Sequence, residues 1–197
     1  MNNTEPTHVW YACYGSNLCR ERFMRYIENC ADTTPPVADR PFTLPHPIYF
    51  AKSFRHWDNG AAAFLDDSRS GAAYSRIYKI TRAQYEDVKR QEGIHYTKKL
   101  SFGEVDGLPV YSFTDTQRNE PLRLPSRAYF SVILRGLREC YGGTLPDVEI
   151  ARYLIGAVLP GDGFAAARAA YEQGRMEIGP CGSELIAAMV EALGAES

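Results

Sequence analysis

An apolar run at residues 9–14 stops abruptly at a polar turn. The stretch YACYGSNL, residues 11–18, carries this run into Gly15, Ser16 and Asn17. A run that is apolar on both faces is typical of a central strand buried on both sides. Apolar residues then recur at helical spacing at Phe23, Tyr26, Ile27 and Cys30. We therefore expect a strand, a tight turn and a helix in direct succession.

Further strands are expected in the middle of the chain. Runs rich in aromatic and small residues between 48 and 80 are separated by DNG and DSRSG, which are turn sequences, so we expect a meander of strands. Thr81 and Gln84 have the spacing of a capping box, which begins a short helix that Gly93 can end. The pair at 106–107, Asp-Gly, predicts a hairpin.

Helices dominate the rest of the sequence. One is expected from about residue 125 to the Gly-Gly pair at 142–143, and another at 147–158. An Ala-rich tail predicts a helix at 164–173 and a last one capped by Ser183. The apolar face of that last helix consists of Leu185, Ile186, Met189 and Leu193. We expect the tail to pack outside the main domain or across a subunit interface; the alternative is a lid.

Composition excludes several classes of protein. The 197 residues, 45% of them hydrophobic, suffice for one compact domain with a full core. A formal net charge of −2 supplies no basic face for nucleic acid or anionic lipid. No run of about eighteen apolar residues and no apolar leader is present, so we expect no membrane span and a cytoplasmic location. Small neutral or zwitterionic molecules are the more natural partners.

Cysteines and histidines give no sign of a disulfide framework or a metal site. The five cysteines are odd in number and widely spaced, without a CxxC pair, so we expect reduced and mostly buried thiols. No pair among the four histidines has the spacing that presents two imidazoles to one metal. The sequence predicts neither a metal nor another cofactor.

The turn at Gly15 and Ser16 is the first candidate for chemistry. It lacks the GxSxG of a nucleophile elbow and the lysine of a phosphate loop, so Ser16 is a weak candidate nucleophile. It offers free backbone N–H groups at a helix start, which bind a carboxylate as readily as a phosphate. The alternative is that Ser16 or Asn17 simply caps the helix.

Glu92 is the second candidate. It stands at the C-terminal end of its short helix, where the helix dipole disfavours an anion by roughly 0.3–1 kcal/mol. If the flanking Ile94 and Tyr96 make its surroundings apolar, its pKa rises toward the range useful for a general base or acid at neutral pH. The alternative is a solvated surface glutamate.

Three motifs in order resemble the gamma-glutamylcyclotransferase family. YACYGSNL is followed by QEG at residues 91–93 and by PSRAYFSVILRG from residue 125. They are similar to the family's YGSN turn, its Glu before a glycine and its PSxxY helix. The resemblance runs from residue 11 to 154 and includes RIYKIT before the Glu helix. EGIHY departs from the more usual aromatic residue directly after the Glu-Gly pair.

The resemblance implies an α+β fold with a small, mostly antiparallel, barrel-like sheet and flanking helices. The family-like domain would span residues 9–160, and a C-terminal helical extension would span residues 161–197.

The resemblance also implies an enzyme that releases 5-oxoproline from a gamma-glutamyl peptide, amine or conjugate. Glu92 would act as general base and then as general acid. The substrate would contact Tyr11, Cys13, Tyr14, Gly15, Ser16, Asn17 and Tyr129. Because Tyr11 and Tyr14 are three residues apart, only one of them need reach the substrate by its side chain. No cofactor, metal, nucleic acid or membrane is implied, and a homodimer is one possible assembly.

Two other interpretations stay open at this point. One is a non-catalytic small-molecule binding protein with the same fold, against which the presence of Glu92 argues. The other is a thiol enzyme that uses Cys13 with His95. The leaving group is also open: glutathione, gamma-glutamyl amino acids, gamma-glutamylamines and protected antibiotic precursors all present the same glutamyl half.

Overall fold

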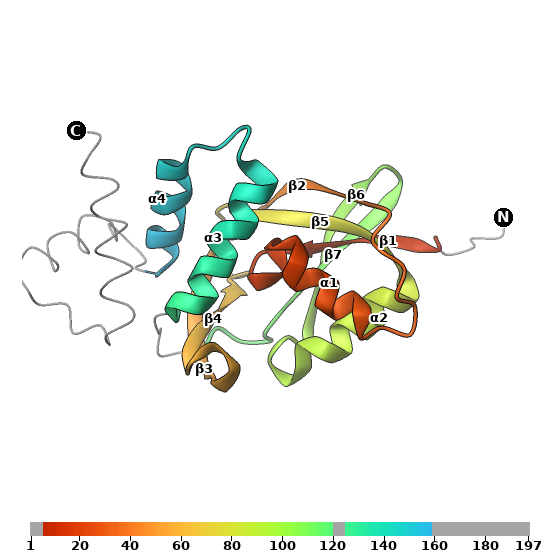
Figure 1. Cartoon of the computed structure of the whole chain (residues 1–197), viewed down its shortest axis with the longest axis horizontal. Coiled ribbons are helices and arrows are strands. Elements are labelled where there is room, and N and C mark those ends of the chain that lie inside the picture. The colour runs from red at the N-terminus through yellow and green to blue at the C-terminus, as the bar shows by residue number, and fades with distance from the viewer. Residues whose placement is uncertain (1–5, 120–124, 159–197) are drawn as a thin grey trace, which may run out of the picture.

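The computed structural model describes residues 6–119 and 125–158, which form two sheets and four longer helices (Figure 1). The strands are β1 His8–Cys13, β2 Ala38–Leu44, β3 Ile48–Phe54, β4 Gly60–Leu65, β5 Ala73–Thr81, β6 Lys98–Val105 and β7 Leu108–Thr114. The α-helices are α1 Arg20–Glu28, α2 Arg82–Glu92, α3 Arg127–Tyr141 and α4 Asp147–Val158. Three short 3-10 helices are η1 Ser16–Leu18, η2 Arg55–Trp57 and η3 Gly93–His95.

The larger sheet has the strand order β2-β5-β1-β7-β6. Its central strand, β1, pairs antiparallel with β5 and parallel with β7, and the other pairs are antiparallel. The smaller sheet is the β3-β4 ribbon. The expected α+β class with a mostly antiparallel sheet is confirmed, although the described strands do not close into a barrel.

The first strand is as buried as its sequence predicts. Residues 9–13 of β1 are each at most 4% exposed, because β1 lies inside the sheet and is covered by helices. Figure 1 shows α1 and α2 side by side across the sheet, and Phe23 of α1 stacks on Tyr11 of β1 and on Tyr78 of β5. The covered end of β1 is where the chain turns into η1.

The meander expected between residues 48 and 80 is confirmed for its first two strands and is wrong for the third. β3 and β4 pair only with each other among the described strands, whereas β5 lies between β2 and β1 in the larger sheet. β2 was not expected, because its sequence ADRPFTL has a weak apolar pattern and contains Pro41. In the structure this strand is largely exposed. Such a strand belongs at a sheet edge, where its apolar pattern is weak and a proline is tolerated.

The predicted helix starts at Thr81 and Ser126 and the hairpin are confirmed. Thr81 Oγ1 accepts from the Gln84 N–H at 3.1 Å, and Gln84 Oε1 accepts from the Thr81 N–H at 3.0 Å. The pair at 106–107 joins β6 to β7 with positive φ at both positions, as a tight hairpin requires. The helices expected at 164–173 and after Ser183, and the domain boundary at 160, lie outside the described residues.

The helix α3 packs directly on η1 through Gly136. A Cβ at this position would lie 2.3 Å from the Cys19 backbone nitrogen and 2.4 Å from the Leu18 carbonyl carbon. Only glycine permits this approach without movement of the backbone. No helix in the described part of the chain is both long enough and apolar enough to cross a membrane.

Candidate active site

A small cavity of about 40 Å³ lies where β1 ends, between the turn, the C-terminal end of α2 and the first turn of α3. It is lined by Tyr11, Cys13, Tyr14, Gly15, Ser16, Asn17, Ala63, Glu92, Tyr96, Phe113 and Tyr129. All eight residues that the sequence singled out are therefore brought to one place. Ala63, Tyr96 and Phe113 were not anticipated as lining residues, although Tyr96 had been noted beside Glu92.

Two residues of the stretch YACYGSNL hold the carboxyl group of Glu92. Tyr11 donates its hydroxyl to Glu92 Oε1 at 3.0 Å, and Asn17 Nδ2 donates to the same oxygen at 2.9 Å. Among the described residues, both hydrogen bonds found to this carboxyl group end on Oε1. The second oxygen, Oε2, is thus the one available to a ligand in the cavity.

Burial raises the pKa of Glu92 from 4.5 to about 7. The hydrogen bonds from Tyr11 and Asn17 and the positive charge of Arg22 act in the opposite direction but do not cancel the effect of burial. The predicted source of this burial is partly wrong, because Ile94 is 82% exposed. The apolar surroundings come instead from the aromatic rings that line the cavity.

Neither Ser16 nor Asn17 caps the helix that follows the turn. Cys19 is the N-cap of α1, and no side-chain hydrogen bond caps either η1 or α1. The Asn17 side chain points to Glu92 instead, and its Oδ1 is buried without a hydrogen-bond partner among the described residues. The turn also leads into a single 3-10 turn, so its backbone N–H groups, rather than the dipole of a long helix, are what it can present to an anion.

Gly15 and Tyr129 fit closely together at the turn. A Cβ on Gly15 would lie 2.8 Å from the Tyr129 hydroxyl oxygen, so a larger residue would displace this phenol. The same oxygen accepts a hydrogen bond from the Ala63 N–H at 3.0 Å. Because the oxygen is used as an acceptor there, the phenolic proton can be donated into the cavity.

Both Tyr11 and Tyr14 face the cavity, although the alternation of a strand required only one of them to do so. The strand β1 ends at Cys13, so Tyr14 lies beyond the last residue that obeys the alternation of a strand. Both rings line the cavity, and the Tyr14 hydroxyl donates to the Phe113 carbonyl oxygen at 2.6 Å.

Cys13 and His95 are not brought together as a thiol–imidazole pair. The Cys13 thiol donates to the Arg76 carbonyl oxygen at 3.2 Å, and burial raises its pKa. His95 does not line the cavity; it lies 3.1 Å from Lys52 Nζ and packs on Phe54. Within residues 6–119 and 125–158, no group of three or more His, Cys, Asp or Glu side chains is placed to hold a metal ion.

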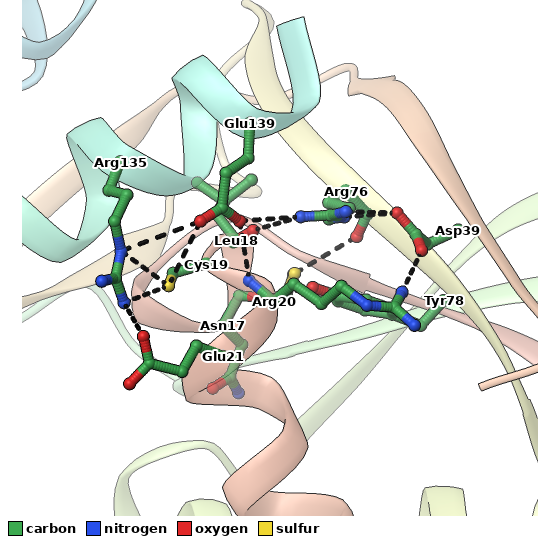
Figure 2. Close-up of polar contacts among 11 residues, drawn as sticks. Asn17, Leu18, Cys19, Arg20, Glu21, Asp39, Arg76, Tyr78, Arg135 and Glu139 are labelled. Atoms are coloured by element: carbon green, nitrogen blue, oxygen red, sulfur yellow. Dashed lines mark hydrogen bonds and ion pairs between the residues drawn. The ribbon is translucent and has the colours of Figure 1, made fainter. Parts of the chain in front are cut away.

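A second group of residues forms hydrogen bonds to the backbone of the turn (Figure 2). Tyr78 of β5 donates its hydroxyl to the Asn17 carbonyl oxygen at 3.1 Å, and Arg76 Nη1 donates to the Leu18 carbonyl oxygen at 3.1 Å. These bonds satisfy carbonyl groups that a single helical turn leaves without internal partners. They also fix the backbone from which the Asn17 side chain reaches Glu92.

Arg76 is itself held by two carboxylates. It forms ion pairs with Asp39 at 2.5 Å and with Glu139 of α3 at 3.2 Å, and Glu139 also accepts from the Arg20 N–H at 3.0 Å. Sequence reasoning did not find this group. The available signal was Arg76 itself, a charged residue directly before the apolar pair Ile77 and Tyr78, and the structure shows it to be 7% exposed.

The fold is shared with a solved structure of a gamma-glutamyl cyclotransferase. One structure of that name matches 94% of this chain and 99% of its own length, with a TM-score of 0.54 and 18% sequence identity. An uncharacterized protein from Homo sapiens matches with the same coverage, TM-score and identity. The chain therefore has the gamma-glutamyl cyclotransferase fold.

Sequence comparisons add one distant relative. The chain is 26% identical over 204 residues to histone deacetylase 5 of Arabidopsis thaliana, an alignment that covers 76% of this chain and 31% of the relative. The chain thus spans about a third of the length of the curated relative that it matches. No family model matches the sequence.

Proposed function

We propose that this protein is a cyclotransferase that releases 5-oxoproline from a gamma-glutamyl compound, with Glu92 as general base and then general acid. The observation that carries the proposal is the buried carboxyl group of Glu92, whose pKa is about 7 and which Tyr11 and Asn17 hold by one oxygen. Such a group is populated in both its acidic and its basic form at neutral pH, as a proton relay requires.

The reaction needs no nucleophile from the protein. The free α-amine of a gamma-glutamyl compound lies a five-membered ring away from its own gamma-carbonyl carbon, so the attack is intramolecular. A new C–N bond closes the ring, and the C–N bond to the leaving amine breaks. The ionised Glu92 takes a proton from the α-ammonium group and returns it to the departing nitrogen. The ring nitrogen gives up a second proton as the lactam forms, and the departing amine takes up this proton to become an ammonium ion, so the reaction balances without water.

Three further groups can hold the glutamyl half. The backbone N–H groups at Gly15 and Ser16 would bind its α-carboxylate. The buried Oδ1 of Asn17 would accept from the α-ammonium group beside Glu92. The Tyr129 hydroxyl would donate to the gamma-carbonyl oxygen, where negative charge develops as the ring closes.

The test is a panel of gamma-glutamyl peptides, amino acids, amines and conjugates incubated with the purified protein, with 5-oxoproline measured by mass spectrometry. Release from at least one class, abolished by Glu92→Gln, supports the proposal. The alternative, a non-catalytic binding protein, predicts no release from any compound while 5-oxoproline still binds in the cavity, as calorimetry and a crystal soak would show.

A further inference from the structure

A second and larger cavity, of about 580 Å³, lies between α1, η2 and α3. It is lined by Glu21, Arg22, Arg25, Tyr26, His56, Trp57, Gln91, Val132 and Arg135. Three arginines against one glutamate give this cavity an excess of positive charge. A hollow of this size and polarity suits a small anionic group better than an apolar one.

This cavity adjoins the one that holds Glu92. Gln91, which lines it, directly precedes Glu92 in the chain, and the charge of Arg22 lowers the pKa of the Glu92 carboxyl group. Tyr26 is another lining residue. Burial and the charge of Glu92 raise the pKa of its phenol, and a hydrogen bond with the Asn17 side chain lowers it. Trp57 of this cavity also packs on Tyr129 of the first, with ring centroids 4.8 Å apart, so the two cavities are neighbours. Arg22 lies over the Trp57 ring and is therefore beside this contact.

Arg22 is the arginine in this cavity whose charge is available to a ligand. Arg25 and Arg135 each form an ion pair with Glu21 at 3.0 Å. Within the part of the chain that the structure describes, Arg22 has no carboxylate at ion-pair distance, and its Nε is buried without a hydrogen-bond partner. A buried guanidinium N–H left without an acceptor is unfavourable, so an acceptor from a ligand would be bound there with a net gain.

Two aromatic rings fix the orientation of this guanidinium group. Its central carbon lies 5.1 Å from the ring centroid of Tyr26 and 5.5 Å from that of Trp57. A guanidinium held in this way offers its donors in a fixed plane, which matches the two oxygens of a carboxylate. Lysine could not reproduce that planar contact.

We propose that this second cavity binds the leaving half of the substrate and that Arg22 recognises a carboxylate on it. The inference rests on the proposed function, because the departing nitrogen must lie at Glu92 and the group attached to it must then extend into adjoining space. The substrate class is thereby gamma-glutamyl amino acids and peptides, whose leaving amine carries a carboxylate, in preference to uncharged gamma-glutamylamines.

The test compares two substrates that differ only in this carboxylate, gamma-glutamylalanine and gamma-glutamylethylamine. The measured quantity is the ratio of their kcat/KM values, in the wild type, in Arg22→Gln and in Arg22→Lys. A ratio removes any effect of Arg22 on the pKa of Glu92, which both substrates share. Arg138→Gln is the matched control, because Arg138 pairs with Asp147 on an exposed surface and lines neither cavity.

We expect the wild type to prefer gamma-glutamylalanine and Arg22→Gln to lower the ratio by about tenfold to a hundredfold, as for the loss of a charged hydrogen bond. The loss should lie mainly in KM for gamma-glutamylalanine, and Arg22→Lys should retain part of the preference. The control should keep the wild-type ratio.

A wild-type ratio near one overturns the inference without any variant, and so does an unchanged ratio in folded Arg22→Gln. In both cases release of 5-oxoproline leaves the proposed function standing. If the wild type releases no 5-oxoproline from either compound or from the wider panel, the proposed function is what fails.

Discussion

At the scale of single residues, the central feature is Glu92, which Tyr11 and Asn17 hold by one carboxyl oxygen. Glu92→Gln should lower turnover by about two to four orders of magnitude, the range usual for the loss of a general acid or base. The fold should survive, because the glutamine oxygen can accept the same hydrogen bonds from Tyr11 and Asn17.

The measurement is 5-oxoproline release, with thermal unfolding as a check on folding. The control is Glu86→Gln on the same helix, where Glu86 is exposed and lies 4.0 Å from Lys89. Near-normal turnover in folded Glu92→Gln would contradict the mechanism.

The pH profile should report the same group. Glu92 must be ionised to accept a proton, so kcat/KM should rise with pH through about 7. Tyr11→Phe keeps the ring but removes the hydrogen bond that most lowers this pKa, and the rising limb should therefore move to higher pH. Tyr14→Phe is the matched control, since its hydroxyl bonds to Phe113 and not to Glu92. A limb that stays in place in Tyr11→Phe would show that another group titrates.

At the scale of elements, the contact between α3 and the turn decides the geometry of the site. Gly136→Ala would place a methyl group 2.3 Å from the Cys19 backbone nitrogen, far inside contact distance. Overpacking of this kind costs about 1–3 kcal/mol, and the backbone that has to move is the one that carries Asn17. Both the free energy of unfolding and turnover should fall.

The control for this substitution is Gly156→Ala on α4. Gly156 is exposed, and nothing lies within 4 Å of a Cβ built there. Alanine should stabilise that helix by roughly 0.5–1 kcal/mol and leave turnover unchanged. Chemical denaturation measures the free energy of unfolding of the two variants. Equal changes in that free energy would show that the close contact between α3 and the turn does not limit the residue at position 136.

At the scale of the whole molecule, the cavity is assembled from residues between Tyr11 and Tyr129. A chain truncated after Pro160 should therefore keep its turnover per folded molecule, whatever the tail adds to stability. Circular dichroism would establish that the truncated chain is folded before 5-oxoproline release is measured. A folded truncation without activity would show instead that the tail completes the site, as a lid would.

Local chemistry was sufficient for much of the molecule. The apolar run before Gly15, the capping box at Thr81 and the Asp-Gly hairpin each depend on the preferences of a few neighbouring residues, so they could be predicted and were confirmed. The position of Glu92 at a helix end could be predicted for the same reason.

Which distant segments meet was decided only by the tertiary structure. Asn17 lies 75 residues from Glu92 in the chain and bonds to it, and Tyr11 does so across 81 residues. The place of β5 beside β1 and the contact of Arg76 with the turn have the same origin. Such pairings depend on how buried surfaces pack against each other, and no spacing within a short stretch of sequence specifies them.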